Sequence, residues 1–462
     1  MLKMYYLLSI FSVLAMLFFS CGPTCEPGQV LLKEKNECVV DTCINFHCGT
    51  GASCVVTTNG PKCECPSPFQ SLDANGNCYY GGLDEVTCSS KGTVKVSSSG
   101  KPYCDCDSGY KQLADGVYSC VPSTLSSFCN GGTCSNGKVI PYFENKPNHG
   151  VNFFITGDGY TESDLSYNGK FAKDATKFIG YLMKREPYKK FAKYVNFYIV
   201  FAKSKQHGVD LSCSSDTVNS VFNTCFDNPG RSTIVRIKSS GRNTLNSFIR
   251  RSGKSAHLKI VILNEDRYHA GTAFPSYDLA IFPRKAGLNS EIVTDITLYH
   301  EVGHAFGKLG DEYGASGSSF GNPPALSRAD RYPNLSLTNN LNIIKWKSLI
   351  PDYNVGAVEG GYYRDYNVWR PQNKCVMRSF DTTEMCPVCK EVLVKRFYSI
   401  LGLRYSIDDF KKEFPPGATR NSFQTEYNTL SPIEKAQLRE IDLKFHNHKH
   451  VISREELENI EY

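Results

Sequence analysis

The cysteines of this chain are concentrated at one end. Fifteen of the twenty lie before residue 135, although the chain has 462 residues. So many cysteines are typical of exported proteins, because cytosolic thiols are kept reduced. The distribution predicts two parts that are stabilised differently: small modules held together by disulfides, and a larger domain that can bury a hydrophobic core without them.

The N-terminus predicts export. Lys3 precedes an uncharged apolar run from Met4 to Phe19, which suits a signal peptide better than a membrane-spanning helix of about 20 apolar residues. We therefore expect residues 1–20 to be a signal peptide, and the protein to be secreted or held at the cell surface. Two interpretations of Cys21 stay open: acylation, as in a lipoprotein attached to the bacterial envelope by its lipid, or a place in a disulfide.

Cysteine spacing subdivides the first part. Six cysteines are separated by gaps of four, five, eight, one and twelve residues, a spacing that resembles the epidermal-growth-factor-like (EGF-like) module, here residues 43–78. A segment of about 40 residues buries too little apolar surface to fold without bridges. The resemblance implies three pairs: Cys43–Cys54, Cys48–Cys63 and Cys65–Cys78.

The neighbouring segments are predicted to be related but smaller. Residues 79–121 resemble a truncated copy of the module, while residues 21–42 and the linker 122–142 each hold a candidate local bridge, Cys25 with Cys38 and Cys129 with Cys134. Only Asp41 stands just before the first cysteine of the module, so we expect no calcium site. We interpret this arm as a passive stalk, with an adhesive arm that binds a carbohydrate or a protein as the alternative.

From about Pro141 the sequence predicts an α/β domain. Strand-like apolar runs alternate with helical patterns, and Thr161 with Asp164 forms a capping-box pattern before one of these helices. We place this domain at residues 143–404 and expect a helical or mobile tail at 405–462, where we interpret His446–His450 as a solvated turn. The predicted strands are Val151–Asp158, Tyr194–Ala202, His257–Asn264 and Tyr277–Pro283.

The stretch HEVGHAF predicts a metal site. His300 and His304 are one helical turn apart, so both imidazoles project from the same side of a helix that begins after Ser290, and imidazole pairs suit Zn²⁺. Glu301 is offset around the helix, where it can take a proton from water that the metal activates. The pattern therefore predicts hydrolysis as well as metal binding. The net charge of +6 is spread along the chain, so we expect no nucleic-acid partner.

The third metal ligand has to come from the residues that follow. Gly307 is a natural place for the helix to end and the chain to turn, and Gly310 offers no side chain but gives the turn slack. Two histidines and one carboxylate form a known catalytic zinc set with an open fourth position. We expect Asp311 to be the third ligand; Glu312 is the alternative, or else it orients one of the histidines.

Four ordered motifs carry a family resemblance. The motif HEVGHAFGKLGDEY, preceded by ITGDGYTESDL and followed by CVMRS and MCPVCKEVL, resembles the IgA-peptidase-like zinc metallopeptidases over about residues 152–397. The resemblance implies an α/β (α+β) metzincin-like fold, zinc bound by His300, His304 and Asp311, and Glu301 as general base. It also implies that Met377 lies in a turn beneath the metal.

Other residues carry weaker expectations. We interpret Asp158 as a cap for the following helix, with a structural cation as the alternative, and we expect Cys213 and Cys225 to form a local disulfide. We also expect Cys375 to pair with one of Cys386 and Cys389 rather than all three serving metal or redox chemistry. An oxyanion donor is expected, and Tyr313 and Arg378 are the nearby candidates.

Together these patterns predict an exported, zinc-dependent endopeptidase that acts on proteins or peptides. The alternative is an adhesin or other binding protein whose peptidase-like domain is a recognition surface, although the intact HExxH pattern argues against it. The motif by itself also leaves hydrolysis of a non-peptide substrate open.

Overall fold

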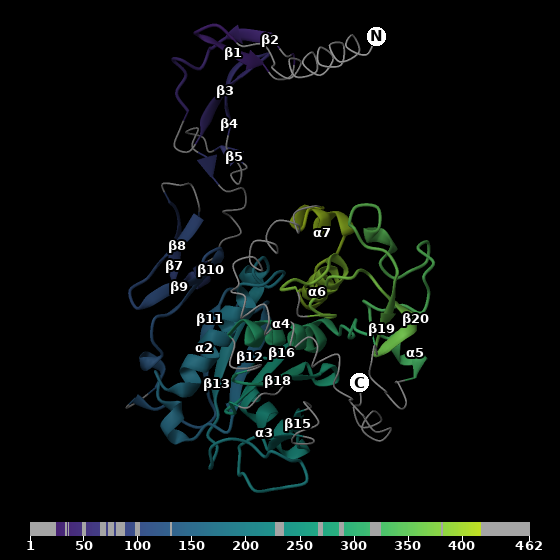
Figure 1. Ribbon diagram of the computed structural model, residues 1–462. Helices are drawn as coiled ribbons and strands as arrows, with labels where there is room; N and C mark the ends of the chain where they lie inside the picture. Colours follow the sequence, from purple (N-terminus) through teal and green to yellow (C-terminus); the bar gives the residue numbers. More distant parts are fainter. Residues whose placement is uncertain are drawn as a thin grey trace, which may run out of the picture. The chain divides into compact units, whose positions relative to one another are not determined.

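The computed structural model describes residues 25–416 (Figure 1) except 33–34, 36, 49–51, 65–70, 73–77, 80–87, 98–101, 130–131, 227–234, 267–270, 286–290, 315–324 and 380–381. Several predictions lie outside these residues: the signal peptide 1–20, Cys21, the pair Cys65–Cys78, the cap at Ser290, and the tail beyond 416. The chain divides into two compact units. The first comprises Met1–Val86 with Val94–Tyr103, and the second comprises Thr87–Thr93 with Cys104–Tyr462.

The first unit is built from short hairpins and disulfides. Antiparallel pairs are formed by β1 (Gln29–Leu32) with β2 (Glu37–Val40), β3 (Ser53–Thr57) with β4 (Gly60–Glu64), and β5 (Ser71–Leu72) with β6 (Cys78–Tyr79). Disulfides join Cys25 to Cys38, Cys43 to Cys54, and Cys48 to Cys63. Because the strands expose much of their surface, these bridges supply stability that a core of this size cannot.

The expected truncated module and linker are in part built into the second unit. The strands β7 (Gly92–Val96) and β8 (Pro102–Cys106) are followed by a hairpin of β9 (Tyr110–Ala114) and β10 (Val117–Pro122). Disulfides join Cys88 to Cys104, Cys106 to Cys120, and Cys129 to Cys134. Val117 and Val121 are buried in the core of the second unit, and Asn145 donates to Ser119 at 2.8 Å. The hairpin therefore shares the core of the larger domain.

A six-stranded sheet organises the second unit, with strand order β11-β13-β12-β16-β18-β17. The inner strands β12 (Val151–Asp158), β13 (Val195–Phe201), β16 (Leu258–Leu263) and β18 (Leu279–Pro283) are parallel neighbours. The edge strands β11 (Lys138–Glu144) and β17 (Thr272–Phe274) run antiparallel. All four inner strands coincide with predicted strands to within two residues, but β11 begins inside the expected linker and the sheet therefore starts earlier than residue 143.

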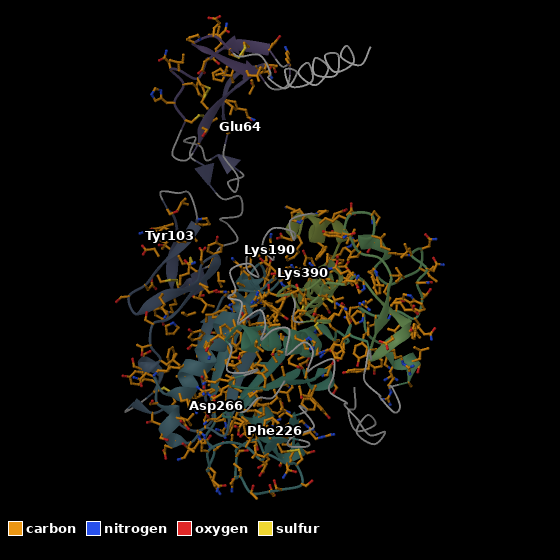
Figure 2. All side chains as sticks on the ribbon, in the orientation of Figure 1. Glu64, Tyr103, Lys190, Phe226, Asp266 and Lys390 are labelled. Carbon is orange, nitrogen blue, oxygen red and sulfur yellow. A yellow bond between two sulfur atoms is a disulfide. The ribbon has the colours of Figure 1, made fainter. Side chains whose placement is uncertain are left out.

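Both faces of the sheet are covered, which makes the domain a mixed α/β structure (Figure 1). Side chains alternate along each strand, so Phe153 and Ile155 of β12 face one core while Phe154 faces the other. The first core is closed by α2 (Lys170–Met183), α4 (Glu291–Gly307) and α6 (Pro387–Ile400). The second core is closed by α3 (Ser239–Arg250) and the hairpin β14 (Thr224–Phe226)–β15 (Val235–Ile237), which includes Phe226 (labelled in Figure 2).

The helical stretch predicted after Thr161, over residues 161–183, is split in two. The Asp164 carboxylate accepts from the Thr161 backbone N–H at 2.9 Å, as the capping pattern predicts, but it caps only the 3₁₀ turn η5 (Glu162–Leu165). Helix α2 begins again at Lys170 after Gly169. The break has a physical reason, because Asn168 and Gly169 favour turns over helix interiors.

The C-terminal third of the domain completes the first core and adds a smaller third one. It contains α5 (Leu326–Ala329), η8 (Lys347–Leu349), the hairpin β19 (Val358–Gly361)–β20 (Arg364–Arg370), and α7 (Ile407–Glu413). The remaining 3₁₀ turns are η2 (Cys88–Ser90), η3 (Ser126–Phe128), η6 (Ala192–Tyr194) and η7 (Pro275–Tyr277). Phe410 of α7 is buried in the first core, so the start of the expected tail packs on the domain. Among the described residues, no helix has the length and apolar character needed to cross a membrane.

Candidate metal centre

Helix α4 positions the HExxH residues. Val293 and Ile296 are fully buried against the sheet side of the first core, as their spacing predicts, and Ile292 packs at its margin. The burial continues through the motif, with His300 4% and Glu301 5% exposed. The helix therefore presents the HExxH residues inside the protein, next to the edge of the sheet formed by β18 and β17.

Helix α4 ends at Gly307, as predicted, and the chain turns sharply after it. Lys308, not Gly307, adopts the left-handed conformation, with φ of 54°. Gly307 is required for space instead, since a Cβ there would lie 2.7 Å from Leu393 of α6. Gly310 does not provide slack: its N–H donates to Asn334 at 2.8 Å, its carbonyl accepts from Asn334 at 2.9 Å, and a Cβ would lie 2.7 Å from Leu335. Both glycines thus allow close packing of the turn.

This turn brings Asp311 to the two histidines. Asp311 Oδ1 lies 3.3 Å from His300 Nε2 and 3.2 Å from His304 Nε2, and the two Nε2 atoms are 3.0 Å apart. Two ligands held about 2.05 Å from one zinc ion at tetrahedral angles are about 3.3 Å apart. The three atoms therefore have the spacing of three ligands on one zinc ion.

The Nδ1 atoms of both histidines are hydrogen-bonded to backbone carbonyls, so metal binding would use the Nε2 atoms. His300 Nδ1 lies 2.9 Å from the Val376 carbonyl and His304 Nδ1 lies 2.6 Å from the Leu309 carbonyl. A carbonyl only accepts, so each Nδ1 carries a proton, and each ring in its neutral, metal-binding form would direct an Nε2 lone pair toward Asp311. Three acceptors within 3.3 Å repel one another unless a cation lies between them. These three atoms, two imidazole nitrogens and one carboxylate oxygen, therefore fit the ligands of a metal ion.

The remaining contacts of Asp311 agree with this arrangement. Its Oδ2 accepts from the Tyr363 hydroxyl at 2.6 Å, whereas the buried Oδ1 has no hydrogen-bond donor. Burial by itself would raise the pKa of Asp311, but the two imidazoles outweigh it and hold that pKa well below its usual range. In the metal-free protein, burial opposes a charge on His304, yet Asp311 raises the pKa of His304 to about 9.

Glu301 lies on the sheet side of the same helix. A Cβ at Gly271 would be 2.5 Å from Glu301 Cγ, so the glutamate packs directly on the segment that leads into β17. Its carboxylate also takes a backbone hydrogen bond from Ala273 of that strand. Burial raises the pKa of Glu301, and the neighbouring histidines oppose the shift. A buried carboxyl with a raised pKa suits a group that takes up and releases a proton near neutral pH.

Met377 packs beneath the helix that carries the ligands. A Cβ at Gly303 would lie 2.8 Å from Met377 Sδ, so the thioether touches the α4 backbone between the two histidines. The preceding residue, Val376, supplies the carbonyl that orients His300, and the Met377 carbonyl accepts from the Glu312 backbone N–H at 2.8 Å. This segment therefore connects both ends of the ligand set.

Two tyrosines flank the ligand carboxylate, and only one of them was expected from the sequence. The rings of Tyr313 and Tyr363 are 5.2 Å apart, and burial, followed by the charge of Asp311, raises the pKa of both. Tyr363 follows Asp311 by 52 positions, so local sequence gave no indication of its contact. Arg378, the other expected oxyanion donor, donates to the Asn373 carbonyl at 2.9 Å.

Glu312 does not join the histidines. Its side chain lies with Cys375, Cys386 and Cys389 in a second group whose ligand atoms are all within 4.8 Å of one another. The expected disulfide from Cys375 is wrong, because all three thiols are unbridged and the sulfurs of Cys375 and Cys389 are 3.7 Å apart. Asp311 and Glu312 are adjacent in the chain, but their carboxylates lie in different groups of metal-ligating side chains. The spacing in the sequence did not show which of the two would lie beside the histidines.

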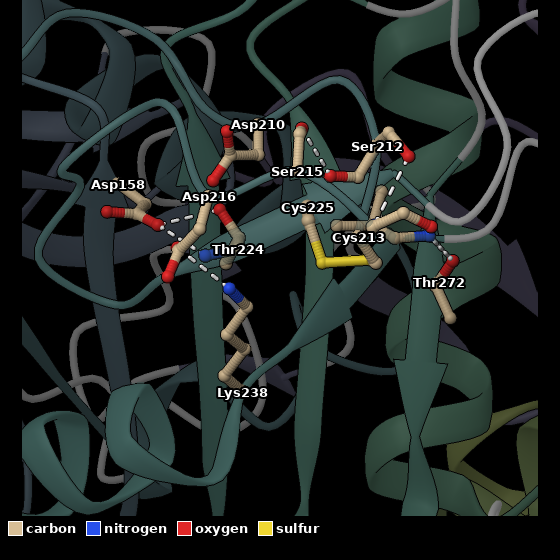
Figure 3. Close-up of a disulfide and its surroundings, with 12 residues drawn as sticks. Asp158, Asp210, Ser212, Cys213, Ser215, Asp216, Thr224, Cys225, Lys238 and Thr272 are labelled. Atoms are coloured by element: carbon tan, nitrogen blue, oxygen red, sulfur yellow. Dashed lines mark hydrogen bonds and ion pairs between the residues drawn. A yellow bond between two sulfur atoms is a disulfide. The ribbon is translucent and has the colours of Figure 1, made fainter.

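Asp158 has a structural role that differs from the predicted helix cap. Its carboxylate is fully buried and accepts six hydrogen bonds, three on each oxygen, mostly from the loop of residues 204–224. The nearby disulfide Cys213–Cys225 joins the same loop to β14 (Figure 3). Asp158 therefore fastens this loop to the end of β12.

A mixed α/β domain whose helix presents a buried histidine, a second and largely buried histidine, and a buried glutamate beside a sheet edge is the arrangement of a metallopeptidase. The chain matches the model of the IgA Peptidase M64 family over residues 143–354 and 351–397, which is more than half of its length. It belongs to this family, and the domain is a peptidase of the metallo type, for which the family implies a metal cofactor. No curated protein matches the chain.

Proposed function

We propose that this chain is an exported, zinc-dependent endopeptidase with a metzincin-like catalytic domain. His300, His304 and Asp311 would hold the zinc ion. The observation that supports this most strongly is the convergence of their three acceptor atoms within 3.3 Å, with no hydrogen-bond donor to Asp311 Oδ1. Two histidines and a carboxylate leave a fourth position open for water or substrate.

Glu301 is the general base in this proposal. When zinc is bound, it supplies Lewis acidity that makes water more acidic and polarises the scissile carbonyl. Glu301 takes the proton of the attacking water and passes it to the leaving amine. Its burial raises its pKa, which suits both steps, and its contact with Gly271 and Ala273 fixes the direction of its carboxyl group.

The proposed substrate is an extended peptide segment. β17 is the last strand in the order of the six-stranded sheet and lies against α4. An extended chain can add to such an edge through backbone hydrogen bonds, which are the same for any sequence. A substrate strand placed there would pass beside Glu301, because the Glu301 carboxylate bonds to the backbone of the same strand.

Export is part of the proposal and is supported by the seven disulfides among the described residues, together with the N-terminal sequence. The first unit is then a disulfide-stabilised stalk for the enzyme. Attachment of that stalk to a membrane through a lipid on Cys21 remains one of the two interpretations of that residue.

The test compares Glu301→Gln with wild type for zinc content and for cleavage of a panel of denatured proteins. We expect zinc to be retained and cleavage to fall by about 10²–10⁴-fold, the usual contribution of a general base. Glu291→Gln is the matched control, since Glu291 is on the same helix but its side chain is 65% exposed and pairs with Lys177 at 3.1 Å. Equal inactivity of wild type and Glu301→Gln over a broad panel would favour a binding protein instead.

A further inference from the structure

A second group of metal-ligating side chains lies next to the proposed catalytic site. We propose that Cys375, Cys386, Cys389 and Glu312 bind a structural zinc ion. All four are at most 1% exposed, and one ligand atom of each lies within 4.8 Å of the others. Cysteine thiolates and a carboxylate are normal zinc ligands, and structural zinc sites are four-coordinate and closed to solvent. This proposal does not depend on the catalytic function proposed above.

The distances within the group fit tetrahedral coordination. Two sulfurs held about 2.3 Å from one zinc ion at tetrahedral angles are about 3.8 Å apart. Cys375 Sγ and Cys389 Sγ are 3.7 Å apart, and Cys389 Sγ lies 3.1 Å from Glu312 Oε1. A disulfide needs a sulfur–sulfur distance of about 2.05 Å.

Glu312 points to a missing cation. Its Oε1 accepts from Asn334 at 2.9 Å, but its buried Oε2 has no hydrogen-bond partner. Leaving one oxygen of a fully buried carboxylate without a donor or a cation is costly. Bound zinc removes that cost, because the carboxylate and the sulfurs would share one divalent charge.

The backbone is arranged to stabilise thiolates. Cys386 is the N-cap of α6, where the helix dipole favours negative charge. The Cys389 N–H is directed at Cys386 Sγ at 3.4 Å, and the Cys386 N–H is directed at Cys375 Sγ at 3.3 Å. Two cysteines separated by Pro387 and Val388 therefore hold their sulfurs together at the start of one helix, the spacing that many structural zinc sites use.

The number of cysteines also favours a metal over a disulfide. Three late cysteines cannot all pair with one another, and seven disulfides join fourteen of the other described cysteines to each other. In an oxidising compartment, close thiols without a metal are prone to form a disulfide. A zinc ion uses all three thiols at once and keeps them reduced.

The second site would stabilise the first one. Glu312 follows Asp311, the proposed third catalytic ligand, and Cys375 precedes Val376, whose carbonyl orients His300. A zinc ion bound by Glu312 and Cys375 thus ties together the two segments that set the geometry of the catalytic ligands. Loss of this ion is expected to weaken metal binding at the catalytic site as well.

Metal stoichiometry tests the proposal. The full chain and a His300→Ala/His304→Ala double variant are purified without chelators, and their zinc content is measured by mass spectrometry of the elements. We expect two zinc ions per chain in wild type and one in the double variant. An organomercurial that titrates thiolates should release that remaining ion. One ion in wild type and none in the double variant would overturn the proposal.

Further variants distinguish the ligands from the fold. Glu312→Gln keeps the shape of the side chain, and in the double-histidine background we expect it to bind the remaining zinc at least tenfold more weakly. Cobalt replacing that zinc should give thiolate charge-transfer absorption, a readout that does not require cysteine variants to fold. The control is Cys213→Ser/Cys225→Ser, which removes a disulfide of the same domain and should keep both ions. A late-cysteine disulfide, detected as a mass two hydrogens too low, would refute the site.

Discussion

Gly271 gives the sharpest test of how Glu301 is positioned. Its φ is outside the left-handed region, so alanine is compatible with the backbone at this position. The added Cβ, however, would lie 2.5 Å from Glu301 Cγ and 3.1 Å from Cδ. Since carbon atoms prefer separations of about 3.5–4.0 Å, the glutamate side chain must move by about 1 Å.

That displacement predicts the magnitude of the effect. A misplacement of about 1 Å at a reacting group can reduce the rate by about 10²-fold, equivalent to about 2.7 kcal/mol of transition-state stabilisation. We therefore expect Gly271→Ala to lower kcat/KM for peptide cleavage by about 10²-fold. Zinc content should stay at the wild-type value, because the three atoms nearest to the added Cβ all belong to Glu301 and none to His300, His304 or Asp311.

The matched control is Gly180→Ala in α2. Nothing lies within 4 Å of a Cβ at Gly180, so this variant should keep full activity and gain about 0.5–1 kcal/mol of helix stability. Both variants are compared by kcat/KM on a fluorogenic peptide obtained from the cleavage panel, and by thermal unfolding. A folded, zinc-loaded Gly271→Ala protein with wild-type kcat/KM would refute the assigned position of Glu301 beside β17.

Three other predictions concern the metal and the fold. Asp311→Ala should lose the catalytic zinc in equilibrium dialysis, and retention at wild-type affinity would exclude Asp311 as a ligand. Because the pKa of His304 is raised to about 9 in the metal-free protein, zinc must displace its proton at lower pH. Zinc affinity should therefore rise on the order of tenfold per pH unit up to about pH 9 and then level off. Calorimetry at about pH 7 should show that about one proton is released for each zinc ion bound. Zinc binding without proton release would contradict this prediction. Asp158→Asn should lower the free energy of unfolding by roughly 3 kcal/mol, because the new amide would direct N–H groups at hydrogen-bond donors such as the Thr224 hydroxyl. The control is Asp216→Asn: the Asp216 side chain is 81% exposed, so this change should alter the free energy of unfolding by less than about 1 kcal/mol. Equal denaturant midpoints would contradict the role of Asp158.

Those features of the fold and of the site that depend on residues close together in the chain could be predicted from the sequence. The strands at 151–158 and 195–201 are continuous apolar runs, and such runs indicate buried parallel strands. The pairing of His300 with His304 follows from one turn of helix, and their capacity to bind one metal follows from imidazole chemistry. The bridges Cys43–Cys54 and Cys48–Cys63 were implied by the resemblance to the EGF-like module, and both are present.

Other features depend on contacts between distant segments. Both Asp311 and Glu312 were chemically acceptable third ligands, and only the path of the chain after Lys308 directs them to different groups. Likewise, the contacts of Tyr363 with Asp311 and of Gly271 with Glu301 join segments 52 and 30 residues apart.

The sequence by itself therefore determined the elements and the chemistry available in this protein: disulfide-stabilised modules, an α/β domain, and a helix with a histidine pair that is suited to bind a metal. The tertiary structure decided which groups meet. It assigned Asp311 to the histidines, gathered Glu312 with three cysteines of which two were expected to form a disulfide, and placed Glu301 at the sheet edge. The physical reason is that periodicity and capping act over a few residues, whereas a metal site is defined by side chains that folding brings within a few ångströms of one another.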